Sequence, residues 1–167
     1  MGRSAEIYIK HKSEATEAVL IRDFLEIVTP LGYDTSAEGS HEVYMAHKEN
    51  PDKAVRVWVH QDKYKAYTIN GEDYYLVVFY DFIWDDERHG IEFMNSDMIL
   101  AITAEYMKKY PDALFHYEWS KEDSMFMDKT DIDSIMLQTF QPGWFFLYKS
   151  HRISSRVNNS RDDWTLR

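Results

Sequence analysis

The stretch YDFIWDDERHG at residues 80–90 holds the densest group of side chains in this chain that could do chemistry. It offers carboxylate oxygens and an imidazole ring, which are ligands suited to magnesium, manganese or zinc. These side chains are Asp81, Asp85, Asp86, Glu87 and His89. The part that reads DDERHG also separates two strand-like runs, and a polar segment in that position is ordinarily a solvated hairpin loop. The stretch is therefore either a site for chemistry or the tip of a hairpin.

A second polar pair follows at His116 and Glu118, within the strand-like run ALFHYEW. Residues two apart on a strand project from the same face, so a carboxylate–histidine centre could form if this pair met Asp81 across a sheet. The metal ligands would then be Asp81, Asp85, His89 and His116. No calcium-loop spacing, H-E-x-x-H pair or other zinc signature is present. A metal-dependent hydrolase is thus the alternative hypothesis.

Other catalytic and cofactor-binding classes have little support in the sequence. The chain has no cysteine, which rules out disulfides, thiol catalysis and cysteine-bound metals. No serine sits in a G-x-S-x-G elbow, and none of the six glycines has the spacing of a phosphate-binding loop. We therefore expect no cofactor, and binding is favoured over catalysis.

The charge of the chain indicates what kind of partner it would attract. The net charge is −10, although the segment 151–167 is basic. An acidic body repels phosphates, so direct binding to nucleic acid is not expected, whereas a basic protein would be steered toward it. Aromatic residues make up 16% of the chain, and Tyr and Trp are enriched at protein interfaces.

These observations predict a surface that binds a basic protein, with Trp84 as an aromatic anchor among acidic side chains. The charged groups would steer association, so reversing the charges of Asp85 and Asp86 should slow it at low salt. The residues assigned to this surface are Asp81, Trp84, Asp85, Asp86, Glu87, His116 and Glu118.

Hydrophobic periodicity predicts an α+β fold, with a mainly antiparallel sheet of hairpins and about three helices packed mostly on one face. Strands are expected at 6–10, 41–47, 54–60, 64–69, 74–84, 91–94, 113–119 and 124–128. Helices are expected within 13–32, 95–111 and from 130 onward. Residues 1–150 would form a single domain, and 151–167 a basic, Ser- and Arg-rich tail that is extended unless Trp164 docks.

Capping residues and turns place the ends of these elements. Ser13 is expected to cap the first helix, and Asn95 or Ser96 the second. The third helix would begin with a capping box formed by Thr130 and Asp133. Asn70-Gly71 is the favoured two-residue hairpin turn.

The segment MNSDMILAITAEYMKKYPDALFHYEWSKEDSMFMDKTDIDSI, which begins at residue 94, resembles small acidic immunity proteins that accompany bacterial polymorphic or contact-dependent toxins. In it a helix ends in YPDALF, a hairpin follows, and DKTDIDSI opens another helix. The resemblance implies a non-enzymatic bacterial protein that binds and blocks a cognate toxin, and a basic nuclease would match the charge.

The resemblance also implies a cytoplasmic protein. The segment MGRSAEIYIKHKSEA lacks the apolar stretch of a signal peptide. No run of the sequence approaches the ~20 apolar residues of a membrane span, so no membrane association is expected.

Overall fold

The computed structural model describes residues 4–10, 13–39, 41–60, 65–81, 91–118, 124–137, 156–158 and 163–166. The helices are α1 (Glu17–Val28), the short 3-10 helix η1 (Thr29–Leu31), α2 (Ile91–Lys109) and α3 (Lys129–Met136). The strands are β1 (Ser4–Ile9), β2 (Asp34–Glu38), β3 (Glu42–Ala46), β4 (Ala54–Val59), β5 (Tyr67–Ile69), β6 (Glu72–Asp81), β7 (Leu114–Glu118), β8 (Ser124–Met127), β9 (Arg156–Asn158) and β10 (Asp163–Leu166).

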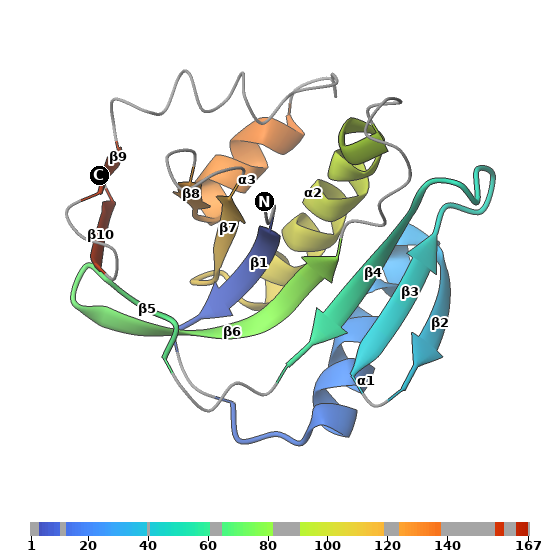
Figure 1. Cartoon of the computed structure of the whole chain (residues 1–167), viewed down its shortest axis with the longest axis horizontal. Helices are drawn as coiled ribbons and strands as arrows, with labels where there is room; N and C mark the ends of the chain where they lie inside the picture. Colours follow the sequence, from blue (N-terminus) through green and yellow to red (C-terminus); the bar gives the residue numbers. More distant parts are fainter. Residues whose placement is uncertain are drawn as a thin grey trace.

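The strands form an antiparallel sheet in the order β2-β3-β4-β6-β1-β7-β8 (Figure 1). The strand β6 is long enough to pair with β1 and β4 near its end and with β5 near its start. Strand β10 runs parallel to β5 and antiparallel to β9, so two short segments of the predicted tail continue this branch of the sheet. The expected α+β class with a mainly antiparallel sheet is confirmed.

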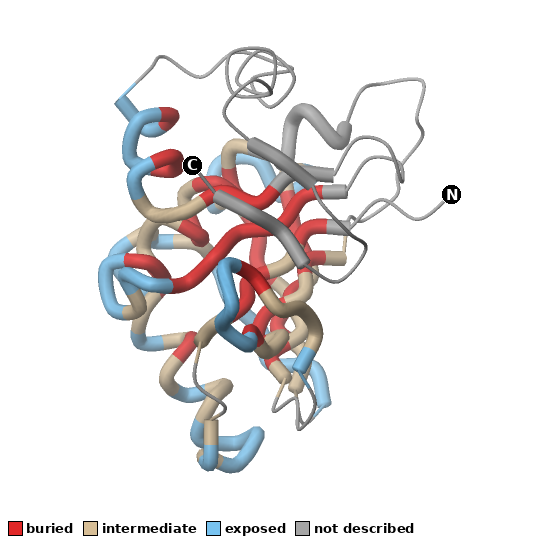
Figure 2. The backbone as a smooth tube through the Cα atoms, turned by 90° about the vertical axis from the view of Figure 1, so that its left-hand side faces the viewer, coloured by how far each residue is buried: buried red, intermediate tan, exposed pale blue. Residues whose placement is uncertain are grey.

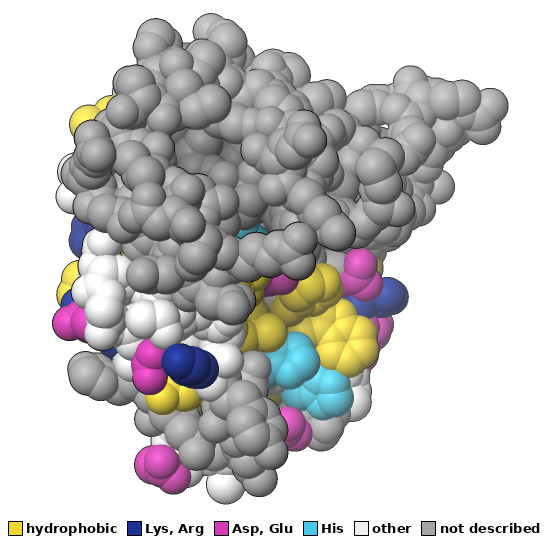
Figure 3. Space-filling view, turned by 60° about the vertical axis from the view of Figure 1, so that its left-hand side comes forward, with side chains coloured by type: hydrophobic (Ala, Val, Ile, Leu, Met, Phe, Trp, Pro, Cys, Tyr) yellow, Lys and Arg dark blue, Asp and Glu magenta, His cyan; other side chains and the backbone are white. Residues whose placement is uncertain are grey.

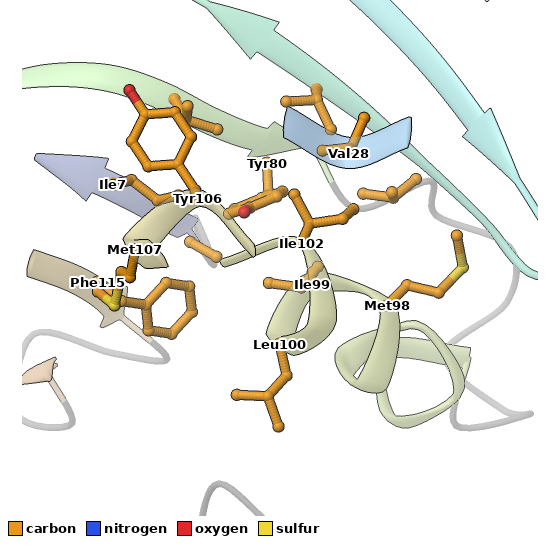
Figure 4. Packing of buried hydrophobic residues seen from close by; sticks show 14 of the residues in the cluster. Ile7, Val28, Tyr80, Met98, Ile99, Leu100, Ile102, Tyr106, Met107 and Phe115 are labelled. Carbon is orange, nitrogen blue, oxygen red and sulfur yellow. The ribbon is translucent and has the colours of Figure 1, made fainter. Parts of the chain in front are cut away.

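All three helices pack on one face of the sheet and bury a single large core (Figures 1 and 2). The stripe of Ile99, Ile102 and Tyr106 on α2 is buried, as the sequence spacing predicts. These side chains meet residues of β1, β6 and α1 (Figure 4). Within the core, the hydroxyls of Tyr80 and Thr103 lie 2.9 Å apart, which satisfies two buried polar groups. In the part of the chain that the structure describes, no helix is both long and apolar enough to cross a membrane.

Helix α1 begins later than Ser13, because the residue that caps it is Thr16. The Thr16 hydroxyl accepts a hydrogen bond from the Val19 amide at 3.4 Å, which satisfies one amide of the first turn. The spacing of Ile21, Phe24, Leu25 and Val28 predicts one apolar stripe, on which Phe24 and Val28 are buried. The end of the helical segment is set by Gly32, whose φ of 70° closes η1 in the left-handed region that glycine tolerates.

The hairpin between β5 and β6 turns at Asn70-Gly71, as predicted. Both residues have positive φ, 52° and 77°. A two-residue turn of this kind matches the right-handed twist of the strands it connects.

The predicted strand at 91–94 is wrong, because these residues form the first turn of α2. The residues of IEFM are compatible with either a short strand or a helical turn. They are helical because they continue the helix that follows them. Asn95 and Ser96 consequently lie inside α2 rather than at its cap. Residues 85–90, predicted as a hairpin loop, and residues 82–84, predicted to end the preceding strand, lie outside the described residues. The next described element after β6 is α2 rather than a strand.

The capping box of α3 is formed by Asp128 and Asp131, two residues earlier than the predicted pair Thr130 and Asp133. The Asp128 carboxylate accepts from the Asp131 amide at 2.9 Å, and the Asp131 carboxylate accepts from the Asp128 amide at 3.1 Å. Aspartate caps a helix as well as threonine does, so the sequence DKTDID offers two possible caps, Asp128 and Thr130.

Strand β2 was not predicted from the sequence. All five of its residues are exposed, so it lacks the apolar alternation that marks a half-buried strand. It is held instead by backbone pairing with β3 over its full length.

Substitution of Leu100 should measure how much the packing of α2 stabilises the fold. Leu100 is 4% exposed and Leu137 is 89% exposed. We expect Leu100→Ala to lower the free energy of unfolding by about 2–5 kcal/mol, because a cavity adds to the lost burial. Leu137→Ala removes the same atoms from a solvated position and should change it by less than about 0.5 kcal/mol. Urea unfolding followed by circular dichroism would contradict the packing if the two variants had similar midpoints.

Candidate functional site on the helix-free face of the sheet

The sheet has a second face that points away from the helices, because alternate strand residues project to opposite sides. Directly opposed residues on neighbouring strands share a face. One cross-strand row runs Glu38, Glu42, Trp58, Phe79, Glu6, His116 and Phe126 across seven strands. The next row runs Ser36, Tyr44, Arg56 and Asp81. We call the surface formed by these two rows the helix-free face.

One end of this face is closed by a small second core. Its buried members are Tyr8, Ile69, Tyr74, Leu114 and Phe126, with Ala66, Tyr67 and Leu76 packed against them. The Tyr67 ring of β5 lies edge-on to Tyr8 and Phe126, with ring centroids 5.3 and 5.2 Å apart. Strand β5 therefore covers the helix-free face above β1, β7 and β8.

His116 lies within this second core and is 1% exposed. Its ring stacks on Phe126 at a centroid distance of 4.4 Å, and its Nδ1 lies 3.0 Å from a Glu6 carboxylate oxygen. The Tyr8 hydroxyl donates to the same oxygen. Glu6 thus holds two polar rings inside an aromatic cluster, and His116, which was assigned to the partner-binding surface, is not accessible to a partner in this structure.

The open end of the face carries a cluster of one tryptophan and two histidines. The His41 and Trp58 rings are 5.0 Å apart, and His41 and His60 are 5.8 Å apart. The Trp58 and His60 rings are stacked, with centroids 6.5 Å apart and an interplanar angle of 15°. All three residues are half-buried. Figure 3 shows histidine and hydrophobic side chains gathered in one patch on this side of the molecule, with acidic side chains at its border.

Three carboxylates surround Arg56 beside this cluster. A Glu42 oxygen lies 2.5 Å from Arg56 Nε, while the nearest atoms of Glu38 and Asp81 are 4.0 and 3.9 Å away. The Glu42 contact is close but poorly directed, since Nε is buried and has no hydrogen bond of good geometry. One guanidinium therefore faces three carboxylates, and this part of the face keeps a net negative charge.

The structure separates the predicted site residues more than it gathers them. Asp81 pairs with Arg56 of β4, whereas His116 pairs with Glu6 of β1. Glu118 ends β7, where its backbone opposes Ser4 and Ser124. The remaining predicted residues, Trp84, Asp85, Asp86, Glu87 and His89, lie outside the described residues. Within the described ranges no three histidine, aspartate or glutamate side chains are grouped so that they could hold a metal ion.

The cluster of His41, Trp58 and His60 was missed by sequence reasoning. A signal was available, because Trp58 alternates with Val57 and Val59, which are buried under the helices. A large aromatic side chain on the opposite face of such a strand needs either a second covering layer or a partner.

Comparison of the chain with protein-family models, with curated proteins and with solved structures found no match. The resemblance to immunity proteins therefore stays a hypothesis.

The buried tyrosines should make the fold sensitive to alkali. Burial, together with the adjacent Glu6 carboxylate, raises the pKa of Tyr8 far above its usual value. Burial and the hydrogen bond to Asp23 raise the pKa of Tyr110 to about 12. The native state then holds these protons more tightly than the unfolded chain, so the free energy of unfolding should fall as the pH rises above about 10.

Tyr8→Phe removes one of these buried phenols, so the free energy of unfolding should fall less steeply with pH above about 10. The variant should also be less stable at neutral pH, because it lacks the hydrogen bond to Glu6. Urea titrations at a series of pH values between about 8 and 11 measure the slope. An identical slope in the variant and the parent protein would contradict the assignment of Tyr8 as a tightly protonated buried phenol.

Proposed function

We propose that this chain is a non-catalytic binding protein that inhibits a basic protein, in the manner of a bacterial immunity protein acting in the cytoplasm. The observation that carries the proposal is the open end of the helix-free face, where an aromatic and histidine cluster adjoins Arg56 and its three carboxylates. Tight interfaces commonly have such a composition, with aromatic anchors at the centre and charged groups around them.

The geometry of the aromatic residues supports a role as anchors. Trp58 and Phe79 are direct cross-strand neighbours on β4 and β6, and both keep part of their surface exposed. Their backbone is fixed within the sheet, so little conformational entropy would be lost when a partner covers them. Among the described residues no second layer lies over Trp58 and Phe79, so these two residues would give a small-molecule ligand only one wall.

The distribution of charge supports a basic partner. The side chains of Glu38 and Asp81 retain 48% and 38% of their exposure, and both are about 4 Å from Arg56. Their carboxylate oxygens are therefore only partly satisfied by that guanidinium, and lysine or arginine from a partner could pair with them. The net charge of −10 would accelerate the encounter at low ionic strength.

A low-salt affinity capture from lysate of the producing cells tests this proposal. The double variant Glu38→Lys/Asp81→Lys reverses two charges on the helix-free face. The matched control Glu17→Lys/Glu26→Lys makes the same change in net charge at two exposed positions of α1. We expect the parent protein and the control to retain one basic protein in about equal amount, and the helix-free-face variant to bind it about tenfold less, because steering and pairing are both lost.

The captured protein must then lose its activity when the parent chain is added and keep it when the double variant is added. Equal capture by both variants would contradict the placement of the surface. Capture of an acidic protein, or of a basic one whose activity is unaffected by the chain, would contradict the proposed function.

A further inference from the structure

Strand β2 has one edge with which no described strand pairs. It is the terminal strand in the order β2-β3-β4-β6-β1-β7-β8, and all five of its residues are exposed. Its only strand partner in the described part of the chain is β3. A free strand edge of this kind presents N–H and C=O groups to which another chain can pair.

The hydrogen-bond pattern identifies which groups of β2 point outward. The Val59 amide donates to the His41 carbonyl at 2.8 Å, and the His47 amide donates to the Lys53 carbonyl at 2.9 Å. Both pairs are directly opposed in the β3–β4 register, so the odd-numbered residues of β3 bond to β4 and the even-numbered ones bond to β2.

In the β2–β3 register the even-numbered residues of β3 oppose Asp34, Ser36 and Glu38, which therefore bond to β3. Thr35 and Ala37 consequently direct their backbone N–H and C=O groups away from the sheet.

The side chains along this edge select the charge of a strand that could pair with it. Ser36 opposes Tyr44 and Glu38 opposes Glu42, so the even-numbered residues of β2 lie on the helix-free face. Asp34 and Glu38 thus place a carboxylate at each end of the edge, while Thr35 and Ala37 are small. A pairing strand would fit best with basic residues opposite the two acids and with uncharged residues between them.

We propose that β2 receives an extended, basic strand of the partner protein, which lengthens the sheet and brings that partner onto the helix-free face. This inference rests on the proposed function, and the backbone N–H and C=O groups of Thr35 and Ala37 would form the pairing. A second copy of this chain is a poorer occupant. The antiparallel register that pairs the whole of β2 with itself places Asp34 opposite Glu38 of the other copy, and directly opposed like charges are destabilising.

Amide hydrogen exchange in the presence of a synthetic peptide tests the pairing directly. The probe is a short peptide in which lysine and valine alternate, and its control carries glutamate in place of each lysine. We expect the amides of Thr35 and Ala37 to exchange more slowly at saturating lysine peptide, whereas the Ser36 amide is already protected by β3 and should change little.

Unchanged exchange at Thr35 and Ala37 would overturn the proposal. Equal protection by the glutamate peptide would overturn its charge selectivity. Protection that appears without peptide as the protein concentration rises would show that a second copy occupies the edge.

Ala37→Pro provides the matching variant. Proline removes an amide that β3 does not use, which an edge strand tolerates, and we expect binding of the lysine peptide to weaken about tenfold, the equivalent of about one hydrogen bond. Ala37→Val keeps the amide and should bind as the parent chain does. Undiminished binding by Ala37→Pro would overturn the pairing.

Capture of the basic protein by two variants distinguishes a failure of β2 pairing from a failure of the proposed function. If Ala37→Pro retains that protein while Glu38→Lys/Asp81→Lys loses it, pairing at β2 is wrong and the proposed function stands. If both variants retain it as the parent chain does, the helix-free face is not the binding surface, so pairing at β2 and the placement of the surface both fail. The proposed function itself fails only if the captured protein is acidic or keeps its activity when the chain is added.

Discussion

The fold depends on the insertion of β1 between β6 and β7. This strand pairs along both of its edges. Among the described strands it is the one that links the group β2, β3, β4 and β6 to the hairpin β7–β8. Ala5 and Ile7 are fully buried beneath the helices, while Glu6 and Tyr8 project to the opposite side and enter the second core. One short strand therefore ties the sheet together and contributes to both of its layers.

The unequal covering of the two faces gives the molecule its candidate function. The helices cover one face and bury its core, whereas β5 covers the other face above β1, β7 and β8. The remaining part, over β3, β4 and β6, retains Trp58 and Phe79 as half-buried aromatic residues beside partly neutralised carboxylates. This surface is continuous with β2, which pairs with β3 at the end of the described sheet.

Fold class and several elements could be predicted from the sequence because their signals are local. The alternating valines of β4, the helical stripe of α1 and the Asn70-Gly71 turn each depend on neighbouring residues. The start of α2 depends on packing, and β2 is held by backbone pairing with β3 rather than by buried side chains; side-chain spacing encodes neither. The candidate site was harder to predict than the fold. His116 reaches Glu6 across 110 positions of the chain, so its burial could not be inferred from its neighbours.

Hydroxyl-radical footprinting of the chain, alone and bound to the basic protein proposed as its partner, tests the central claim most directly. Oxidation reports the exposure of individual side chains, and the chain carries reactive residues on both layers: Trp58 on the helix-free face and the exposed Met136 on α3. The structure predicts that the partner protects Trp58 and leaves Met136 as reactive as in the isolated chain. Protection of Met136 with unchanged oxidation of Trp58 would place the interface on the helices and contradict the assignment of the helix-free face as the functional surface.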